Sequence, residues 1–246
     1  MKIIAFIPAR YGSTRLPGKP LINILDKPMI QHVYENALKL KMLDKVVILT
    51  DSDEIKNAVE GFGGEVCMTD VSITSGSERI LSVLDQYKEY QIIVNIQGDE
   101  PLLDSNDIEK AIQTLVNDDN AHISTLVKKI DDNMDIVEPN VVKVVLDKNG
   151  YCLYFSRSKI PFIRDNAETT EYFKHIGLYI YRRQVIEKLN RLPYSMLEDA
   201  EKLEQLRFLE NGYRIKAAFA ESNIHGVDVK EDLIIVEKML KSKLNI

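Results

Sequence analysis

Short apolar runs alternate with longer amphipathic stretches over the first half of the chain. The apolar runs are Ile3 to Ile7, Val46 to Leu49 and Ile92 to Ile96, and such continuous runs are typical of strands buried on both faces. Between the first two, apolar side chains recur at helical spacing from Ile30 to Leu38, directly after Pro28. Because strand and helix alternate up to about residue 118, the pattern predicts an α/β fold with a mainly parallel sheet covered by helices.

A second helix is predicted after Val46 to Leu49. Asp53 can cap it, it continues through Glu60, and the glycines that follow end it before a strand from Glu65 to Met68. Ligands of parallel sheets bind beyond the carboxyl ends of the strands. The loops after Ile7, Thr50 and Ile96 should therefore meet at one edge of the sheet.

The pattern becomes strand-rich in the second half. Strands are predicted at Val141 to Leu146, Tyr151 to Phe155 and Ile176 to Tyr181, and Asn149-Gly150 predicts a tight hairpin between the first two. We interpret residues 147–190, roughly, as a smaller strand-rich lobe within a single domain of residues 1–246.

The C-terminal part returns to alternation of helix and strand. The pattern predicts a helix from Glu198 to Glu210, a strand from Ile215 to Phe219 and a closing helix after Lys230.

Composition narrows the class of protein. The net charge of -6 weighs against a protein that coats nucleic acid, so an anionic ligand needs a local basic pocket. Cys67 and Cys152 lack metal or redox spacing, which favours buried thiols in a reducing cytoplasm. The N-terminal apolar run is too short for a signal or a membrane span, so no membrane partner is expected.

The loop between Pro8 and Pro20 is the first candidate for chemistry. It carries three cations, two hydroxyls and two glycines directly after a strand, a combination that suits the triphosphate of a nucleotide. It is not a P-loop, because five residues separate Gly12 from Gly18 and a proline follows Lys19. An ordinary basic surface turn is the alternative.

Two carboxylates are candidates for holding a metal ion. Asp99 follows the buried strand that ends at Ile96, and Asp228 follows an irregular stretch after the last predicted strand. Carboxylates together with phosphate oxygens suit the octahedral coordination of Mg²⁺. Each aspartate alone could instead be a helix cap or a turn residue.

A series of motifs in fixed order extends over nearly the whole chain. They are IPARYGSTRLPGKPL, SGSER, VNIQGDEPL, PNVVKVVLD, GYCLYFSRSKIP, HIGLYIYR, LEQLR and GVD. This series resembles the 3-deoxy-manno-octulosonate (Kdo) cytidylyltransferase family, the CMP-Kdo synthetases of lipopolysaccharide and capsule biosynthesis. The resemblance implies a Rossmann-like nucleotidyltransferase fold and a homodimer that forms through the smaller lobe. It also implies transfer of CMP from CTP to a 3-deoxy-2-keto sugar acid, with Mg²⁺ as cofactor and release of pyrophosphate.

The resemblance assigns roles to residues of this chain. The nucleotide site would comprise Ala9, Arg10, Ser13, Lys19, Ser75, Gly76, Arg79 and Gln97. Arg10, Lys19 and Asp99 would act in catalysis, and Asp99 and Asp228 would hold Mg²⁺. The sugar acid would face Arg157, His175, Tyr179, Glu204 and Gln205. Without the resemblance, His175 reads as a strand histidine and Arg157 as a surface cation.

The chain departs from the family pattern at one place. Ser72 and Ile73 stand where the family usually has Asp-His. The change either marks a variant acceptor, such as 8-amino-3,8-dideoxy-manno-octulosonate, or is tolerated drift in a surface loop. A nucleotide-sugar-dependent glycosyltransferase and a non-catalytic nucleotide sensor are the alternatives from other classes.

Overall fold

A computed structural model describes residues 1–12, 16–164 and 170–244. The chain divides into two compact units, one of Met1–Glu109 with Ser222–Ile246 and one of Lys110–Glu221. The strand-rich lobe predicted at residues 147–190 falls within the second unit. In the part of the chain that the structure describes, no helix combines the length and the apolar character needed to cross a membrane.

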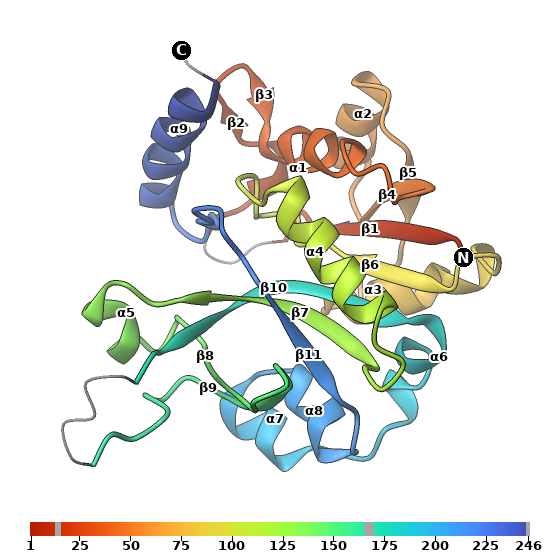
Figure 1. Cartoon of the computed structure of the whole chain (residues 1–246). Coiled ribbons are helices and arrows are strands. Elements are labelled where there is room, and N and C mark those ends of the chain that lie inside the picture. Colours follow the sequence, from red (N-terminus) through yellow and green to blue (C-terminus); the bar gives the residue numbers. More distant parts are fainter. Residues whose placement is uncertain (13–15, 165–169, 245–246) are drawn as a thin grey trace. The chain divides into compact units, whose positions relative to one another are not determined.

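A parallel sheet forms the centre of the first unit (Figure 1). Its strands lie in the order β6-β1-β4-β5, and every neighbouring pair is parallel. They are β1 (Ile3–Ala9), β4 (Lys45–Thr50), β5 (Val66–Met68) and β6 (Ile92–Asn95). The predicted α/β fold with a mainly parallel sheet is confirmed here, because the apolar runs are the buried strands.

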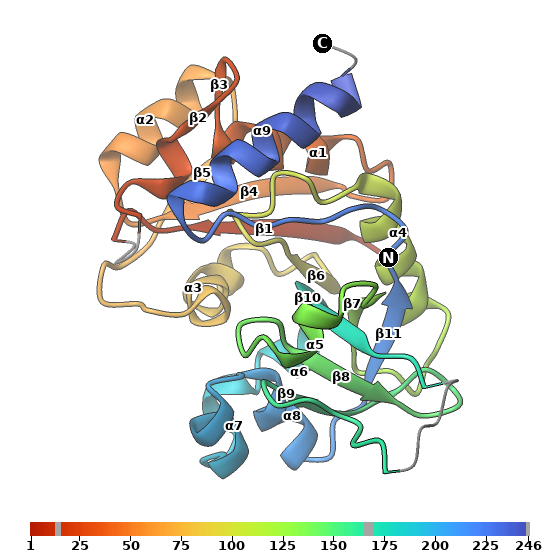
Figure 2. The same cartoon turned by 90° about the vertical axis from the view of Figure 1, so that its left-hand side faces the viewer.

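Helices cover both faces of this sheet. Figure 2 shows α1 (Met29–Leu38) and α2 (Asp53–Gly61) on one face and α3 (Gly76–Val83) on the other. The prediction that Asp53 caps α2 is wrong, because Ser52 is the cap. The Ser52 backbone is extended and its hydroxyl accepts a 3.3 Å hydrogen bond from the N–H of Ile55.

The C-terminal helix completes the core of the first unit. This helix is α9 (Lys230–Leu244), which packs beside the hairpin of β2 (Asn23–Ile24) and β3 (Lys27–Pro28). The buried cluster between them contains Ile24, Met29, Leu102, Val227, Val236 and Leu240. Short 3₁₀ helices, η1 (Lys19–Leu21) and η2 (Leu84–Gln86), lie in the connections. Burying Val227 fixes the loop that carries Asp228.

The second unit has a mixed sheet in the order β11-β7-β10-β8-β9. The pair of β11 and β7 is parallel, and the pairs β7–β10, β10–β8 and β8–β9 are antiparallel. The strands are β7 (Ile123–Lys129), β8 (Lys143–Leu146), β9 (Cys152–Ser156), β10 (Phe173–Arg182) and β11 (Ile215–Phe219). The predicted hairpin is confirmed, since Gly150 takes a φ of +80° between β8 and β9.

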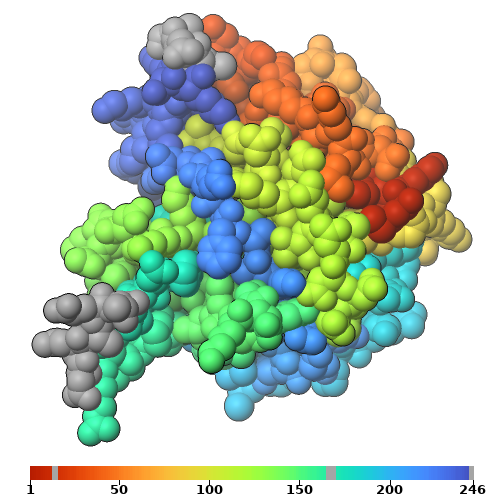
Figure 3. Space-filling view, in the orientation of Figure 1, coloured from red at the N-terminus to blue at the C-terminus, as the bar shows by residue number. Residues whose placement is uncertain are grey.

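Short helices complete the second unit. They are α5 (Asn133–Val137), α6 (Arg183–Ile186), η3 (Leu189–Arg191), α7 (Met196–Glu201) and α8 (Gln205–Glu210), and α4 (Ser105–Val116) runs across the boundary between the units. After β9 the chain continues along the surface (Figure 3), and Phe162 is 85% exposed there.

The helix predicted from Glu198 to Glu210 is two helices. Lys202 ends α7 in the left-handed conformation, with a φ of 53°, and α8 begins at Gln205. A left-handed residue breaks the run of helical hydrogen bonds, and lysine gives no sequence signal for this conformation. The break places Glu204 and Gln205 at the start of a new helix.

Candidate functional site

The first unit contains a cavity of about 280 Å³ at the carboxyl ends of its parallel strands. It is lined by Pro8, Ala9, Arg10, Lys19, Pro20, Met29, Thr74, Ser75, Gly76, Arg79, Gln97, Gly98, Asp99 and Asp228. All described residues that the sequence predicted for the nucleotide and the metal are in this lining. Ser13, the remaining one, lies outside the described residues. The structure therefore gathers into one cavity residues that lie more than two hundred positions apart in the sequence.

An ammonium group joins the two predicted metal carboxylates. Lys19 Nζ lies 2.6 Å from Asp99 Oδ2 and 3.6 Å from Asp228 Oδ1. It also donates a 2.7 Å hydrogen bond to the carbonyl of Val227. The Lys19 side chain is 13% exposed and that of Asp99 34%, so water reaches the carboxylate more readily than the ammonium. Carboxylates that converge on one cation supply the oxygen ligands that a divalent cation needs.

A helix N-terminus and a glycine shape the walls of the cavity. Ser75 caps α3, its hydroxyl accepting a 3.1 Å hydrogen bond from the N–H of Glu78. The first N–H groups of a helix have no partner within it and favour anions, and Ser75 and Gly76 bring them to the cavity. Gly98 packs against the preceding loop so closely that a Cβ there would lie 2.8 Å from the carbonyl oxygen of Pro8.

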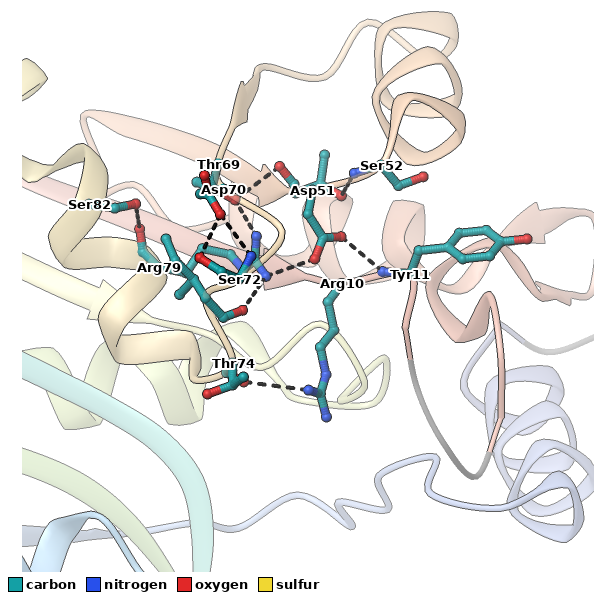
Figure 4. A network of polar contacts seen from close by, with 12 residues as sticks. Arg10, Tyr11, Asp51, Ser52, Thr69, Asp70, Ser72, Thr74, Arg79 and Ser82 are labelled. Atoms are coloured by element: carbon teal, nitrogen blue, oxygen red, sulfur yellow. Dashed lines mark hydrogen bonds and ion pairs between the residues drawn. The ribbon is translucent and has the colours of Figure 1, made fainter.

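Asp51, which no predicted site included, holds two loops of the cavity through hydrogen bonds (Figure 4). Asp51 Oδ2 pairs at 2.9 Å with the buried guanidinium of Arg79, and Asp51 Oδ1 accepts a 3.2 Å hydrogen bond from the N–H of Tyr11. Arg79 also donates to the carbonyl of Ile73 at 2.9 Å and to the hydroxyl of Thr69. No motif marked Asp51, because its partners are distant in sequence.

The departure from the family pattern lies on the loop that Arg79 holds. The Ser72 hydroxyl donates a 2.6 Å hydrogen bond to Asp70, in a local turn at the surface. Ile73 contributes its backbone carbonyl to Arg79. Neither side chain lines the cavity.

The residues predicted for the sugar acid lie in the second unit. His175 and Tyr179 are on β10, and their rings are 5.2 Å apart. The ring of His175 also meets Phe155 edge-on at 5.1 Å, and its Nε2 lies 2.9 Å from the hydroxyl of Thr125. A bulge in β10 between Ile176 and Tyr179 is secured by that hydroxyl, which donates to the carbonyl of Leu178 at 2.7 Å. The bulge sets the direction of Tyr179.

The start of α8 lies near this aromatic pair. Burial raises the pKa of Tyr179 well above its ordinary value, and the nearby charge of Glu204 adds to the effect. Gln205 is 5% exposed, and its Nε2 is buried with no hydrogen-bond partner. An unpartnered buried amide in a native protein calls for an explanation, and a ligand oxygen is one.

Arg157 is held by its own set of acceptors. Its Nε donates to the carbonyl of Glu201 at 2.8 Å, and one terminal nitrogen donates to the carbonyl of Pro139 at 3.0 Å. The carboxylate of Glu201 also accepts hydrogen bonds from the N–H of Arg157, at 2.9 Å, and from the hydroxyl of Ser156. These contacts fix the direction of the guanidinium. Its acceptors in them are backbone carbonyls rather than a carboxylate, so they leave its charge in place.

His175, which is partly buried on β10, predicts a pH dependence of stability. Burial lowers the pKa of His175 to about 3, whereas the unfolded chain has the ordinary value. Below the unfolded pKa the unfolded state takes up a proton that the folded state cannot, so this contribution to stability is lost as the pH falls. The free energy of unfolding should drop by about 1 kcal/mol between pH 6.5 and 5.5 through this group. Urea denaturation of the wild-type chain and of His175→Gln measures it, and an equally steep decline in the variant would contradict the prediction.

The cytidylyltransferase family model matches residues 4–216. The chain belongs to this family. A 3-deoxy-manno-octulosonate cytidylyltransferase of Thermodesulfovibrio yellowstonii is 46% identical, over 98% of this chain and 99% of the relative. An 8-amino-3,8-dideoxy-manno-octulosonate cytidylyltransferase of Shewanella halifaxensis is also 46% identical, over 98% of this chain and 99% of the relative. A solved structure of CMP:2-keto-3-deoxy-manno-octonic acid synthetase complexed with CTP is 42% identical, covers 99% of this chain and 100% of its own, and has a TM-score of 0.94.

The fold of this cytidylyltransferase is thus that of the CMP-Kdo synthetases, as the sequence predicted. Among the described residues no group of three or more His, Cys, Asp and Glu side chains could hold a metal. Asp99 and Asp228 fit Mg²⁺ because this ion usually takes one or two protein carboxylates and completes its shell with phosphate oxygens and water.

Proposed function

We propose that the chain transfers CMP from CTP to Kdo, forming CMP-Kdo and pyrophosphate. The observation that carries this proposal is the single cavity that gathers Arg10, Lys19, the N-terminus of α3 and two carboxylates. A basic, glycine-lined cavity suits a triphosphate, and the similar solved structure is complexed with CTP.

The residues of the cavity have distinct roles in this proposal. Arg10 and Lys19 hold phosphate oxygens by charge-assisted hydrogen bonds, and Ser13 belongs to the same phosphate loop. The N–H groups at Ser75 and Gly76 face anionic oxygens. Ala9, Gln97 and the buried Arg79 shape the rest of the nucleotide site.

Asp99 and Asp228 are the residues that would hold Mg²⁺. When bound, the ion supplies charge neutralisation on the phosphates and on the attacking oxygen. The two aspartates gather negative charge at one wall, and Lys19 balances it from 2.6 Å away.

The reaction is an in-line displacement at the α-phosphorus of CTP. The anomeric oxygen of the sugar acid forms a bond to that phosphorus, its proton passes to solvent water, and the bond to the pyrophosphate oxygen breaks. Arg10 and Lys19 stabilise the charge that grows on the leaving pyrophosphate. Positioning and electrostatic stabilisation account for most of the acceleration.

The second unit supplies the sugar-acid contacts in this proposal. Arg157 faces the sugar carboxylate, while Glu204 and Gln205 bind hydroxyl groups, with the unpartnered Nε2 of Gln205 as one donor. His175 and Tyr179 give an aromatic wall. The 8-amino sugar stays the alternative acceptor, because relatives with either name are 46% identical to this chain.

A screen of pyrophosphate release tests the function. CTP, UTP and ATP are each combined with Kdo, 8-amino-Kdo and sialic acid, and release is expected with CTP and Kdo. Preference for the amino sugar would identify the alternative acceptor. Dominant use of UTP or ATP would overturn the cytidylyl assignment. If no combination releases pyrophosphate, separate incubations distinguish a sensor, which binds CTP, from a glycosyltransferase, which consumes a finished CMP-sugar.

The assembly and setting follow from the same proposal. We propose that the chain forms a homodimer through the second unit. This unit exposes large apolar side chains whose contact with water is unfavourable, namely Leu153, Phe162, Tyr194 and Met196. We also propose that the enzyme acts in the cytoplasm for lipopolysaccharide or capsule synthesis. Light scattering should give twice the mass of one chain, and a monomer would contradict the dimer.

A further inference from the structure

A network of polar contacts reaches Arg10 and its neighbour Tyr11 from two loops (Figure 4). On one side, Asp51 Oδ1 holds the N–H of Tyr11, the next residue in the chain, at 3.2 Å. On the other side, the guanidinium of Arg10 donates a 3.5 Å hydrogen bond to the carbonyl of Thr74. The loop that carries Thr74 is held one residue earlier, at the carbonyl of Ile73, by Arg79.

Asp51 is the residue that both sides share. Its Oδ2 pairs at 2.9 Å with Arg79, and the two side chains are 9% and 2% exposed. The guanidinium of Arg79 donates hydrogen bonds to Asp51, Thr69 and Ile73 of the same unit. Because a buried charge without a partner is costly, this pair forces the two loops into one arrangement.

We infer that Asp51 is a positioning residue for nucleotide binding, which aims Arg10 at the phosphates by fixing both the phosphate loop and the 69–74 loop. The inference rests on the proposed function. It also gives Arg79 a role beneath the cavity, as the cation that carries the constraint from Asp51 to the carbonyl of Ile73. Asp51 itself touches neither substrate, since it does not line the cavity.

The chemistry of the contact identifies a sharp variant, Asp51→Asn. The carboxylate accepts from a donor at each oxygen, Tyr11 N–H at one and Arg79 at the other. An amide has the same shape but one oxygen and one NH₂ group, so one of the two contacts becomes donor against donor. Either orientation releases one of the loops that flank Arg10.

Steady-state kinetics and hydrogen exchange test the inference together. For Asp51→Asn, we expect the KM for CTP to rise about tenfold, because that is the effect of losing one charge-assisted hydrogen bond. The KM for the sugar acid should stay within about twofold of the wild-type value. Amide exchange in the protein without CTP should accelerate in peptides covering residues 10–12 and 72–74. Glu65→Gln is the matched control, because it makes the same change in an exposed ion pair with Lys45 and should alter neither.

A second substitution separates positioning from general loosening. In an Arg10→Met background, Asp51→Asn should have almost no further effect on the KM for CTP, since the residue it positions is gone. If Asp51→Asn does not fold, Thr69→Val removes the other side-chain acceptor of Arg79 and takes its place in the same measurements.

Several results would overturn the inference. They are an unchanged KM for CTP, equal changes in both KM values, or full additivity with Arg10→Met. Exchange is read without CTP, so it judges the coupling of the loops even if the wild-type chain releases no pyrophosphate. A wild-type chain that releases no pyrophosphate would overturn the proposed function itself.

Discussion

Replacement of Asp99 by asparagine is expected to lower pyrophosphate release about 100- to 1,000-fold, because it removes one charge from the two-carboxylate wall. Asparagine keeps the shape of the side chain, so the cavity should persist. Asp228, 58% exposed, provides the only other predicted metal carboxylate among the described residues of this wall. The measurement is initial rate against Mg²⁺ concentration, and the variant should also need more Mg²⁺ for its half-maximal rate.

The control for Asp99→Asn is the same change at Asp104. Asp104 lies in the same unit and pairs with Lys243 at 2.8 Å, and it does not line the cavity. Burial opposes ionisation of Asp104, but its hydrogen bond with Lys243 lowers its pKa. Asp104 therefore forms an ion pair with a lysine, as Asp99 does with Lys19. Asp104→Asn should leave turnover close to wild type. Turnover near wild type in Asp99→Asn would sink the assignment of Asp99.

The sequence predicted the elements of the fold better than their ends. Each apolar run of the first unit became a buried parallel strand, since side chains buried on both faces leave a continuous signal in the sequence. The break at Lys202 left no signal, because only the tertiary structure holds a lysine at a φ of 53°. At α2 the predicted cap, Asp53, is one residue too late: serine and aspartate both cap helices, and the extended backbone that makes Ser52 the cap is a property of the folded chain.

The candidate site followed a similar rule. Residues on the strand-end loops, such as Lys19 and Asp99, could be predicted because parallel strands bring their carboxyl ends to one edge. Asp51 also follows a strand, but its partners Tyr11 and Arg79 stand 40 and 28 residues away in sequence. Burial of a charge in a specific pair is a property of the folded structure, and one sequence does not display it. The enclosure of His175 by aromatic rings is hidden for the same reason.

Lys19→Met should lower kcat/KM for CTP about 100-fold. Methionine has a similar length and an apolar end, so it fills the same space and removes the charge that stabilises the phosphates. Pyrophosphate release at varied CTP concentration measures the effect. Lys45→Met is the matched control, because Lys45 also pairs with a carboxylate at 2.6 Å, that of Glu65, in the same unit and away from the cavity.

Lys19→Met should also change the affinity for Mg²⁺, and this change should be a gain where turnover shows a loss. Its ammonium lies against Asp99 and Asp228, where it repels any further cation that these carboxylates attract. Removing one unit charge about 4 Å from a divalent ion in water changes the interaction by about 2 kcal/mol, so Mg²⁺ should bind Lys19→Met about 30-fold more tightly in the absence of CTP. Calorimetric titration with Mg²⁺ measures this. Weaker Mg²⁺ binding together with lost turnover would show that Lys19 serves to hold the two carboxylates in place. That result would contradict its role as a phosphate ligand whose charge opposes Mg²⁺ binding at Asp99 and Asp228.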